Sequence, residues 1–467
     1  MIHQYKLNGQ NIVLDIGSGA IHLVDSLAYD IIELYEAAPI EEIKKEMLLK
    51  YKSNPDITEQ EISDVIDDIE ELKKAGKLFS NDDYENIVRV AAIRDPGGHG
   101  NPPLQKGSVI KALCLHVAHA CNLTCDYCFA RAGNYLGEDA LMSFEVGKQA
   151  LDFLVANSGN RKNLEVDFFG GEPLMNWAVV KKLVKYARTL EEPNNKKFRF
   201  TLTTNGILID DDVISFANKE MNNVVLSLDG RSKVHNHFRR TINGKGSYDI
   251  ILPKFQKLVK ERGDKSYYIR GTFTHNNTDF IKDILHMADL GFKELSMEPV
   301  VCAPSDPYAL TKEDLPKLFE QYELLAKEMA KRDKEGNGFT FYHFMIDLEH
   351  GPCIYKRVTG CGSGTEYLAV TPVGELYPCH QFVGDKKYLM GDVWNGVTNT
   401  QIRNQFSKCN VYSREKCKEC WAKFYCSGGC AANSYHAAGN INDTYDYGCK
   451  LFRKRIECAI WLKVQEI

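Results

Sequence analysis

The sequence predicts an α/β protein in which a core of alternating strands and helices lies between a small N-terminal domain and a cysteine-rich C-terminal module. Three observations predict this organisation. Over residues 108–312, apolar runs of strand length alternate with stretches of helix length, which is typical of a parallel sheet with outer helices. Residues 1–80 carry three short strand patterns and then three helix patterns. From residue 348 to residue 467, cysteines crowd the chain.

The composition is ordinary for a soluble globular protein. The chain has 467 residues and a net charge of −5, which gives no reason to expect nucleic acid. No apolar run approaches the roughly 18 residues that a membrane span needs, and the first residues form no secretory signal. Fifteen cysteines without an export signal are typical of metal binding in a reducing cytosol. We therefore expect a cytoplasmic protein without a membrane or nucleic-acid partner.

Residues 1–80 predict a small winged-helix-like domain. Its strands are expected at 5–7, 12–15 and 20–24, and its helices near 27–37, 40–52 and 58–75. Thr58 and Glu61 form the capping-box pattern that starts the third helix. The domain holds 16 acidic and 8 basic residues, and such a surface repels a phosphate backbone. The winged helix is therefore not expected to bind DNA.

The rest of the chain divides into four further segments. Residues 81–107 predict a linker, because they are dense in proline and glycine around 95–103. The core of residues 108–312 has strands expected at 112–117, 164–169, 198–202, 224–228, 267–273 and 295–299. The helices between them are expected from Ser143 onward and at 175–189, 209–219, 248–262 and 279–290. Six strands are too few for a closed eight-stranded barrel. Residues 313–347 predict a helix that bridges to the module of residues 348–467.

The first core strand leads directly into three closely spaced cysteines. They are Cys121, Cys125 and Cys128, with Tyr127 between the last two. Thiolates are the usual ligands of iron–sulfur clusters. A four-iron cluster with three protein thiolates leaves one iron open, as catalytic metal sites do. The alternative is a partial zinc site or a set of buried thiols.

Glycines and polar residues follow the next three strands, where βα loops carry active sites in barrel-like folds. They are Gly170, Gly171 and Glu172, then Thr203 and Asn205, then Ser227 with Arg239 and Arg240 shortly beyond. A carboxylate after a glycine pair can accept a hydrogen bond from an ammonium group. Taken alone, each of these motifs is more typical of a turn.

In this order after the three cysteines, the motifs resemble those of the radical S-adenosylmethionine (SAM) enzymes. The resemblance implies a partial (β/α)6 barrel, a [4Fe–4S] cluster on the three cysteines and a SAM molecule chelated by the open iron. Its implied cofactor-binding residues are Tyr127; Gly170, Gly171 and Glu172 near the amino group; Thr203, Asn205 and Ser227 near the ribose or carboxylate; and Arg239, or alternatively Arg240, on the carboxylate.

The later cysteines resemble the SPASM module, which holds two auxiliary [4Fe–4S] clusters. The resemblance assigns Cys361, Cys379 and Cys430 to the first and Cys417, Cys420, Cys426 and Cys449 to the second, which makes three clusters in the chain. Cys353 is a candidate fourth ligand of the first auxiliary cluster. Without it, one iron stays open to a substrate thiolate. The alternative is a pair of zinc sites.

The combination resembles the maturases of ribosomally made peptides, and most closely the SCIFF maturases, which join cysteine sulfur to a carbon of another residue. The resemblance implies a cysteine-rich precursor whose leader adds a strand to the small N-terminal sheet, and an electron donor such as a flavodoxin or ferredoxin. The radical derived from SAM removes a substrate hydrogen, a substrate thiolate then bonds to that carbon, and the auxiliary clusters carry away the surplus electron.

Two alternatives stay open. One is a dehydrogenase that makes formylglycine, as the sulfatase-maturing relatives do. In those enzymes an aspartate follows the cysteine that matches Cys379, whereas His380 stands here as a candidate base. The other is an iron–sulfur electron carrier or scaffold without enzymatic activity, which the SAM-pocket motifs disfavour.

Overall fold

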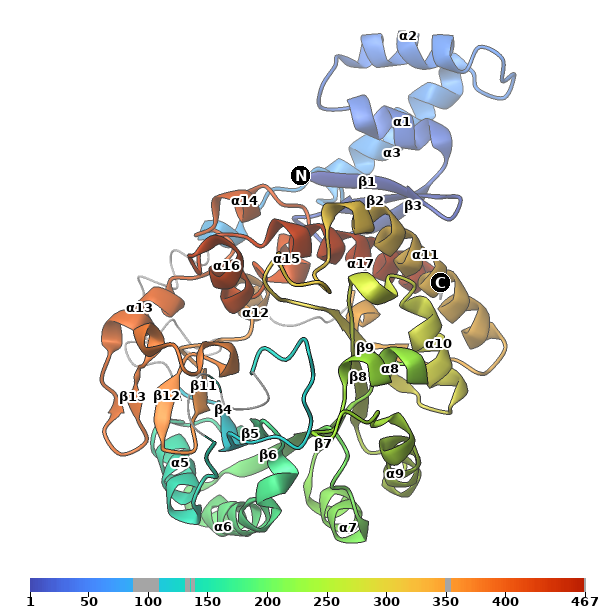
Figure 1. The fold of residues 1–467 in the computed structure, drawn as a ribbon. Helices are drawn as coiled ribbons and strands as arrows, with labels where there is room; N and C mark the ends of the chain where they lie inside the picture. Colours follow the sequence, from blue (N-terminus) through green and yellow to red (C-terminus); the bar gives the residue numbers. More distant parts are fainter. Residues whose placement is uncertain (87–108, 131–134, 136–138, 349–353, 466–467) are drawn as a thin grey trace.

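The computed structural model describes residues 1–86, 109–130, 135, 139–348 and 354–465 as a mixed α/β fold (Figure 1). Within these residues the large sheet has eleven strands, in the order β10-β9-β8-β7-β6-β5-β4-β11-β12-β13-β14, and a small sheet has the order β1-β2-β3. Most of the predicted linker, from residue 87 to residue 107, lies outside the described residues.

Six neighbouring parallel strands form the middle of the large sheet, so the predicted alternation of strands and helices is confirmed. They are β4 (Ala112–Ala118), β5 (Asn163–Gly170), β6 (Lys197–Thr204), β7 (Asn223–Ser227), β8 (Tyr267–Phe273) and β9 (Glu294–Pro299). The connecting helices lie outside the curved sheet in Figure 1 and are α5 (Phe144–Ala156), α6 (Trp177–Asn194), α7 (Asp211–Glu220), α9 (Tyr248–Arg262) and α10 (Ile281–Asp289). The sequence did not predict the short helix α8 (Ser232–Phe238), which follows β7.

The two faces of these strands differ in polarity, because successive side chains of a strand point to opposite faces. One face is apolar and fully buried in the core, as at Phe168, Phe200 and Leu226. The opposite face carries partly exposed polar side chains, as at Asp167 and Thr201. The parallel sheet therefore surrounds a polar interior.

Strands from the C-terminal part of the chain extend both edges of the six-stranded core. At one edge β10 (Thr340–Phe341) pairs with β9. At the other edge β11 (Tyr367–Val370) pairs in parallel with β4, and β12 (Glu375–Tyr377), β13 (Gly391–Asp392) and β14 (Gly396–Val397) continue in antiparallel order. The cysteine-rich segment is thus attached to the strand that leads into Cys121.

The expected bridging helix over residues 313–347 is too long. Helix α11 (Leu315–Lys334) ends before Gly336, which has a φ of 76° in the left-handed region that favours glycine. The chain then returns to the sheet as β10. The sequence expectation missed this stop because the apolar and aromatic residues continue past the glycine.

Short helices make up most of the C-terminal segment and cover the open end of the sheet. They are α12 (Ile354–Thr359), α13 (Thr400–Ser407), α14 (Glu415–Lys418), α15 (Lys423–Cys426) and α16 (Ala431–Ala438), followed by the long α17 (Asp446–Val464). Single 3-10 turns lie at Pro173–Asn176, His275–Asn277, Lys312–Asp314, Tyr342–Phe344, His380–Phe382 and Lys386–Tyr388. No helix of the described residues is both long and apolar enough to cross a bilayer.

The N-terminal region has the three strands and three helices that its sequence predicts. They are β1 (Ile2–Leu7), β2 (Gln10–Asp15), β3 (Ile21–Val24), α1 (Ser26–Leu34), α2 (Ile40–Lys50) and α3 (Glu59–Lys74). The Thr58 side chain caps α3 by accepting a hydrogen bond from the Glu61 amide. Its likeness to a winged helix stays a prediction.

The small sheet is buried on both faces and packs on α17 (Figure 1). Val13 belongs to the core formed with α1–α3, whereas Leu7 and Ile12 belong to the main core. The His3 ring stacks on Trp421 at a centroid distance of 3.7 Å. The N-terminal region is therefore packed against the cysteine-rich segment.

Candidate cofactor and iron–sulfur site

The loop that carries Cys121, Cys125 and Cys128 is fastened to the segment that follows α8. The Thr124 amide donates to the Arg240 carbonyl at 2.8 Å, and the Asp126 amide donates to the Phe238 carbonyl at 3.3 Å. These bonds hold the cysteine loop over the carboxyl ends of the strands, where active sites of barrel-like folds lie.

Asp229 joins the cysteine loop to two strands. It lies two residues after the end of β7 and is fully buried. Its carboxylate accepts hydrogen bonds from the Tyr127 hydroxyl, from Arg239 Nε at 2.9 Å and from the Thr272 amide at 3.0 Å. The sequence motifs predicted Ser227, two residues earlier, as a site residue, but they did not predict Asp229. A carboxylate directly before a glycine at a strand end was the signal that could have identified it.

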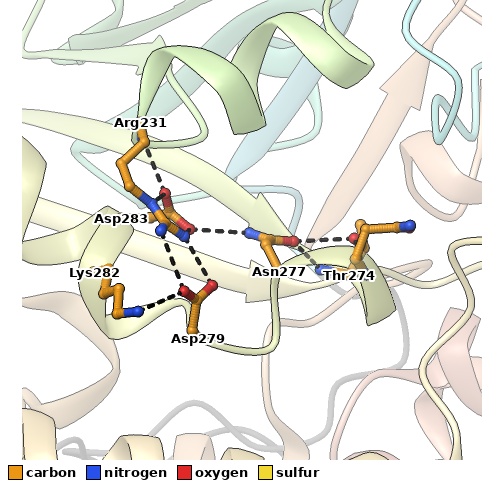
Figure 2. Close-up of polar contacts among 7 residues, drawn as sticks. Arg231, Thr274, Asn277, Asp279, Lys282 and Asp283 are labelled. Carbon is orange, nitrogen blue, oxygen red and sulfur yellow. Dashed lines mark hydrogen bonds and ion pairs between the residues drawn. The ribbon is translucent and has the colours of Figure 1, made fainter.

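A second buried network holds the turn that carries Asp229 (Figure 2). Arg231 donates from its backbone amide and from its Nε to Asp283 Oδ1, at 3.0 and 2.7 Å, and its Nη2 reaches Asp279 at 2.8 Å. Gly230 has a φ of 105°, and a Cβ there would lie 2.2 Å from the Asp283 Cβ. Only glycine therefore lets this turn approach α10 so closely.

The thiols of the cysteine loop are poorly suited to ionise alone. Burial raises the pKa of Cys121 to about 11 and that of Cys125 to about 12. A bound cation supplies the missing stabilisation, because a metal-bound thiol is deprotonated outright. Asn205 Nδ2 lies 3.7 Å from the Cys121 sulfur and adds a polar partner. The donor set therefore fits an iron–sulfur cluster.

The described residues contain no group of three His, Cys, Asp or Glu side chains gathered tightly enough for one metal ion. A four-iron cluster does not require such closeness, since each thiolate binds a different iron.

Gly170 brings the end of β5 against the end of β4. Its φ is 128°, and a Cβ there would lie 2.2 Å from the Ala118 carbonyl oxygen. The neighbouring Gly171 amide donates to that same oxygen at 2.8 Å. Because neither glycine has a side chain, the backbone beside the cysteine loop is left uncovered. This fits the prediction that the backbone approaches a ligand closely here.

The Glu172 side chain points into the protein interior. Its fully buried carboxylate accepts from Thr204 Oγ1 at 2.7 Å, from the Asn205 amide at 2.8 Å and from the Leu174 amide at 3.0 Å. Burial raises its pKa to about 7. In this geometry Glu172 holds the turn after β6 and so positions Asn205. Thr204 makes the side-chain contact with it, whereas the neighbouring Thr203 lies half-buried on β6, and its place near SAM stays a prediction.

The two candidate arginines for the SAM carboxylate differ in their surroundings. Arg240 is exposed and pairs with Asp126 at 2.7 Å. Arg239 is largely buried beside the Tyr127 ring, and within the described residues only its Nε donates a hydrogen bond. Its terminal nitrogens are therefore free of protein partners, which favours Arg239. Ser227 lies half-buried at the end of β7, on the polar side of the sheet.

The seven predicted auxiliary ligands lie in two groups. Cys361, Cys379 and Cys430 are close enough that neighbouring thiols contribute to raising the pKa of Cys379, after burial. In the second group the pKa of Cys426 is raised to about 12, first by burial and then by the other three members, Cys449, Cys417 and Cys420. The structure thus gathers the sets that the resemblance assigns, and their metal ligation stays a prediction. Cys353 lies outside the described residues.

His380 follows Cys379 and faces aromatic rings. Its ring lies 5.5 Å from that of Phe129, which follows Cys128, and 5.1 Å from that of Phe169. Burial and, to a smaller extent, the charge of Arg270 lower the pKa of His380 to about 4. The imidazole is therefore neutral near pH 7. The contact between the rings of His380 and Phe129 joins the segment that carries the later cysteines to the loop that carries the first three.

A cavity of about 1950 Å³ lies between the cysteine loop and the C-terminal segment. Cys125, Tyr127 and Cys128 line one part of it, and Gln381 and Tyr435 line another. It exceeds the size typical of small-molecule pockets, so it has room for a cofactor together with a peptide segment. Cys302 also lines this cavity and is partly exposed.

We expect Asp229→Asn to destabilise the protein by about 3–5 kcal/mol, because it leaves the buried Arg239 charge without its partner. A lower midpoint of chemical unfolding measures the loss. Asp126→Asn is the matched control: it removes the exposed pair with Arg240 and should cost less than about 1 kcal/mol. Equal midpoints for the two variants would show that Asp229 does not hold the site together.

Comparisons with known proteins agree with this geometry. Residues 115–288 match the model of the radical SAM superfamily. The chain is 22% identical over 452 residues to the radical SAM cyclopropyl synthase TigE of Paramaledivibacter caminithermalis, covering 90% of this chain and 87% of that protein. It is 25% identical over 334 residues to a cysteine-type anaerobic sulfatase-maturating enzyme of Clostridium novyi, covering 67% and 85%.

Two solved structures share the fold. One is native anSMEcpe with bound AdoMet and a peptide, with a TM-score of 0.61 and 21% identity over 75% of this chain and 96% of that one. The other is Streptococcus suis SuiB bound to S-adenosylmethionine, with a TM-score of 0.54 and 17% identity over 96% and 98%. Residues 115–288 thus match the radical SAM superfamily, and the chain is similar to a radical SAM cyclopropyl synthase and to a sulfatase-maturating enzyme.

Proposed function

We propose that the protein is a radical SAM peptide maturase that forms thioether bonds between cysteine sulfur and carbon in a ribosomally made, cysteine-rich peptide. The observation that carries the proposal is the large cavity, which is lined both by the cysteine loop of the radical SAM domain and by the C-terminal cysteine segment. The relationship to maturating enzymes supports a peptide substrate.

The chain's own residues have distinct roles in this proposal. The three loop cysteines hold one [4Fe–4S] cluster, and Asp229 fixes that loop through Tyr127. The terminal nitrogens of Arg239 would hold the carboxylate of SAM when it is bound. When bound, the cluster and SAM supply the radical that removes a hydrogen from carbon. The cavity walls orient the peptide, and an external flavodoxin or ferredoxin supplies electrons.

Formylglycine formation in a sulfatase-type substrate is the second candidate. The similarity to sulfatase-maturating enzymes favours it to the same degree. His380 takes the place of the aspartate expected for that activity, and its ring faces Phe129 and Phe169. The nearby Arg270 charge and the aromatic surroundings disfavour a protonated His380, so we rank thioether formation first.

The experiment that tests the function has two steps. Anaerobic incubation with SAM and a reductant should release 5′-deoxyadenosine, which an electron carrier or scaffold would not produce. Co-expression with a cysteine-rich precursor peptide encoded beside the gene should then give a product that has lost hydrogen and resists thiol alkylation but keeps its sulfur. Loss of sulfur together with a new aldehyde would instead establish the formylglycine reaction.

The cluster count gives a direct prediction. The reconstituted protein should hold about twelve irons, in three four-iron clusters. Replacing Cys121, Cys125 and Cys128 together with Ala should remove about a third of the iron and all SAM cleavage. Iron content and the yield of 5′-deoxyadenosine measure the two effects. Zinc in the C-terminal segment, or unchanged iron in the triple variant, would refute the ligand assignment.

Leader recognition at the small sheet gives a second prediction. Strand β3 pairs with β2 on one side only, so its other edge is available for an added strand. Leu23 on β3 is 49% exposed. We expect Leu23→Glu to weaken precursor binding about tenfold or more, since a buried charge without a partner is costly, and to leave SAM cleavage without peptide unchanged.

Leu49→Glu is the control for this prediction, because Leu49 is 69% exposed on α2 and lies away from the β3 edge. Fluorescence anisotropy with a labelled precursor measures both affinities. If the two variants bind as tightly as the unmodified protein, the N-terminal region does not recognise the leader through this edge.

A third prediction concerns the first auxiliary cluster. We propose that Cys361, Cys379 and Cys430 alone hold it, which leaves an open position for a substrate thiol. Cys353→Ala should then keep the full iron content and much of the thioether formation, whereas Cys361→Ala should lose about four irons. Iron analysis separates the two variants, and equal losses in both would make Cys353 a fourth ligand.

A further inference from the structure

Arg414 is a buried cation at the start of α14, the short helix that carries Cys417. Its side chain is almost completely buried, with 3% of the residue exposed. Nη2 donates to the Ile441 carbonyl at 2.7 Å and lies 3.1 Å from the Cys409 sulfur. These two contacts fix the plane of the guanidinium.

The remaining nitrogens of Arg414 lack partners. Nε and Nη1 are buried and make no hydrogen bond within the described residues. No ion pair within those residues involves Arg414 either. A buried guanidinium with unsatisfied donors is costly unless an anion lies beside it. The geometry therefore calls for an anion that protein groups of the described chain do not supply.

The position of Arg414 identifies this anion. A Cβ on Gly429 would lie 3.8 Å from the Cys426 sulfur and 3.9 Å from Arg414 Nη1. Because glycine has no side chain, Gly429 places no side-chain atoms between the Cys426 sulfur and the Arg414 guanidinium. A Cβ on the neighbouring Gly428 would lie 3.5 Å from Arg414 Nη1, and this glycine pair leads directly into Cys430. The Cys417 amide donates to the Arg414 carbonyl at 2.9 Å. Arg414 thus lies within electrostatic reach of both predicted auxiliary cysteine groups.

We propose that Arg414 is a positioning residue that faces both auxiliary clusters and raises their reduction potentials. The proposal rests on the proposed function, since it needs those clusters. A thiolate-bound cluster is anionic, and each added electron increases its negative charge. A nearby cation and N–H donors to sulfur therefore favour the reduced form. Arginine suits this role because it stays charged when buried and presents several donors in a rigid plane.

The test is a redox titration of the reconstituted full chain monitored by electron paramagnetic resonance, in which the radical SAM cluster is recognised by its response to added SAM. Arg414→Gln should keep the iron content and shift the auxiliary signals to more negative potentials. Arg414→Lys, which keeps the charge but loses the planar donors, should shift them less. Lys416→Gln is the control, because Lys416 lies on the same helix but is 67% exposed and pairs with Asp446.

Each outcome decides the proposal. Potentials of Arg414→Gln equal to those of the unmodified protein would overturn it. If Arg414→Gln fails to retain iron, Arg414→Lys decides: restored clusters support a role for the charge, whereas loss of iron there too assigns Arg414 to packing alone. Unmodified protein that takes up zinc or no metal in the C-terminal segment would refute the proposed function itself, and this inference with it.

Discussion

The arrangement of the site depends on one buried carboxylate, that of Asp229. A buried charge needs partners that satisfy its hydrogen-bonding capacity, and here they come from three separate segments. Tyr127 comes from the cysteine loop, Arg239 from the end of α8 and the Thr272 amide from β8. Satisfying Asp229 therefore brings the cysteine loop and the proposed SAM-binding arginine to the same place. The hydrogen bonds of Arg231 to Asp283 hold the turn that carries Asp229 in place.

The second constraint is the pairing of β11 with β4. The same strand that leads into the first three cysteines also serves as the edge on which the C-terminal segment is built. Because backbone pairing fixes register, the later cysteines cannot shift relative to the earlier ones without breaking the sheet. This explains how two segments more than two hundred residues apart can line one cavity, and why a peptide inside it meets both.

Much of the architecture could be predicted from local patterns. The strand–helix alternation and the start of α3 at Thr58 are signals within a few residues, and both appear in the structure. Interactions between distant residues gave no such signal. The bond between Tyr127 and Asp229 joins positions 102 residues apart, and the inward orientation of Glu172 depends on the amide of Asn205, directly after β6. The end of α11 at Gly336 was misjudged because apolar periodicity continued beyond it.

The packing of the N-terminal sheet on the cysteine-rich segment restricts how such enzymes can be recombined. His3 stacks on Trp421, which directly follows Cys420, and the Tyr5 hydroxyl donates to the Glu457 carbonyl at 3.0 Å. Leu7 and Ile12 are buried in the main core. A chimera that imports a foreign N-terminal region must therefore also import a matching surface around Trp421. The N-terminal region and the cysteine-rich segment are thus exchanged as a unit.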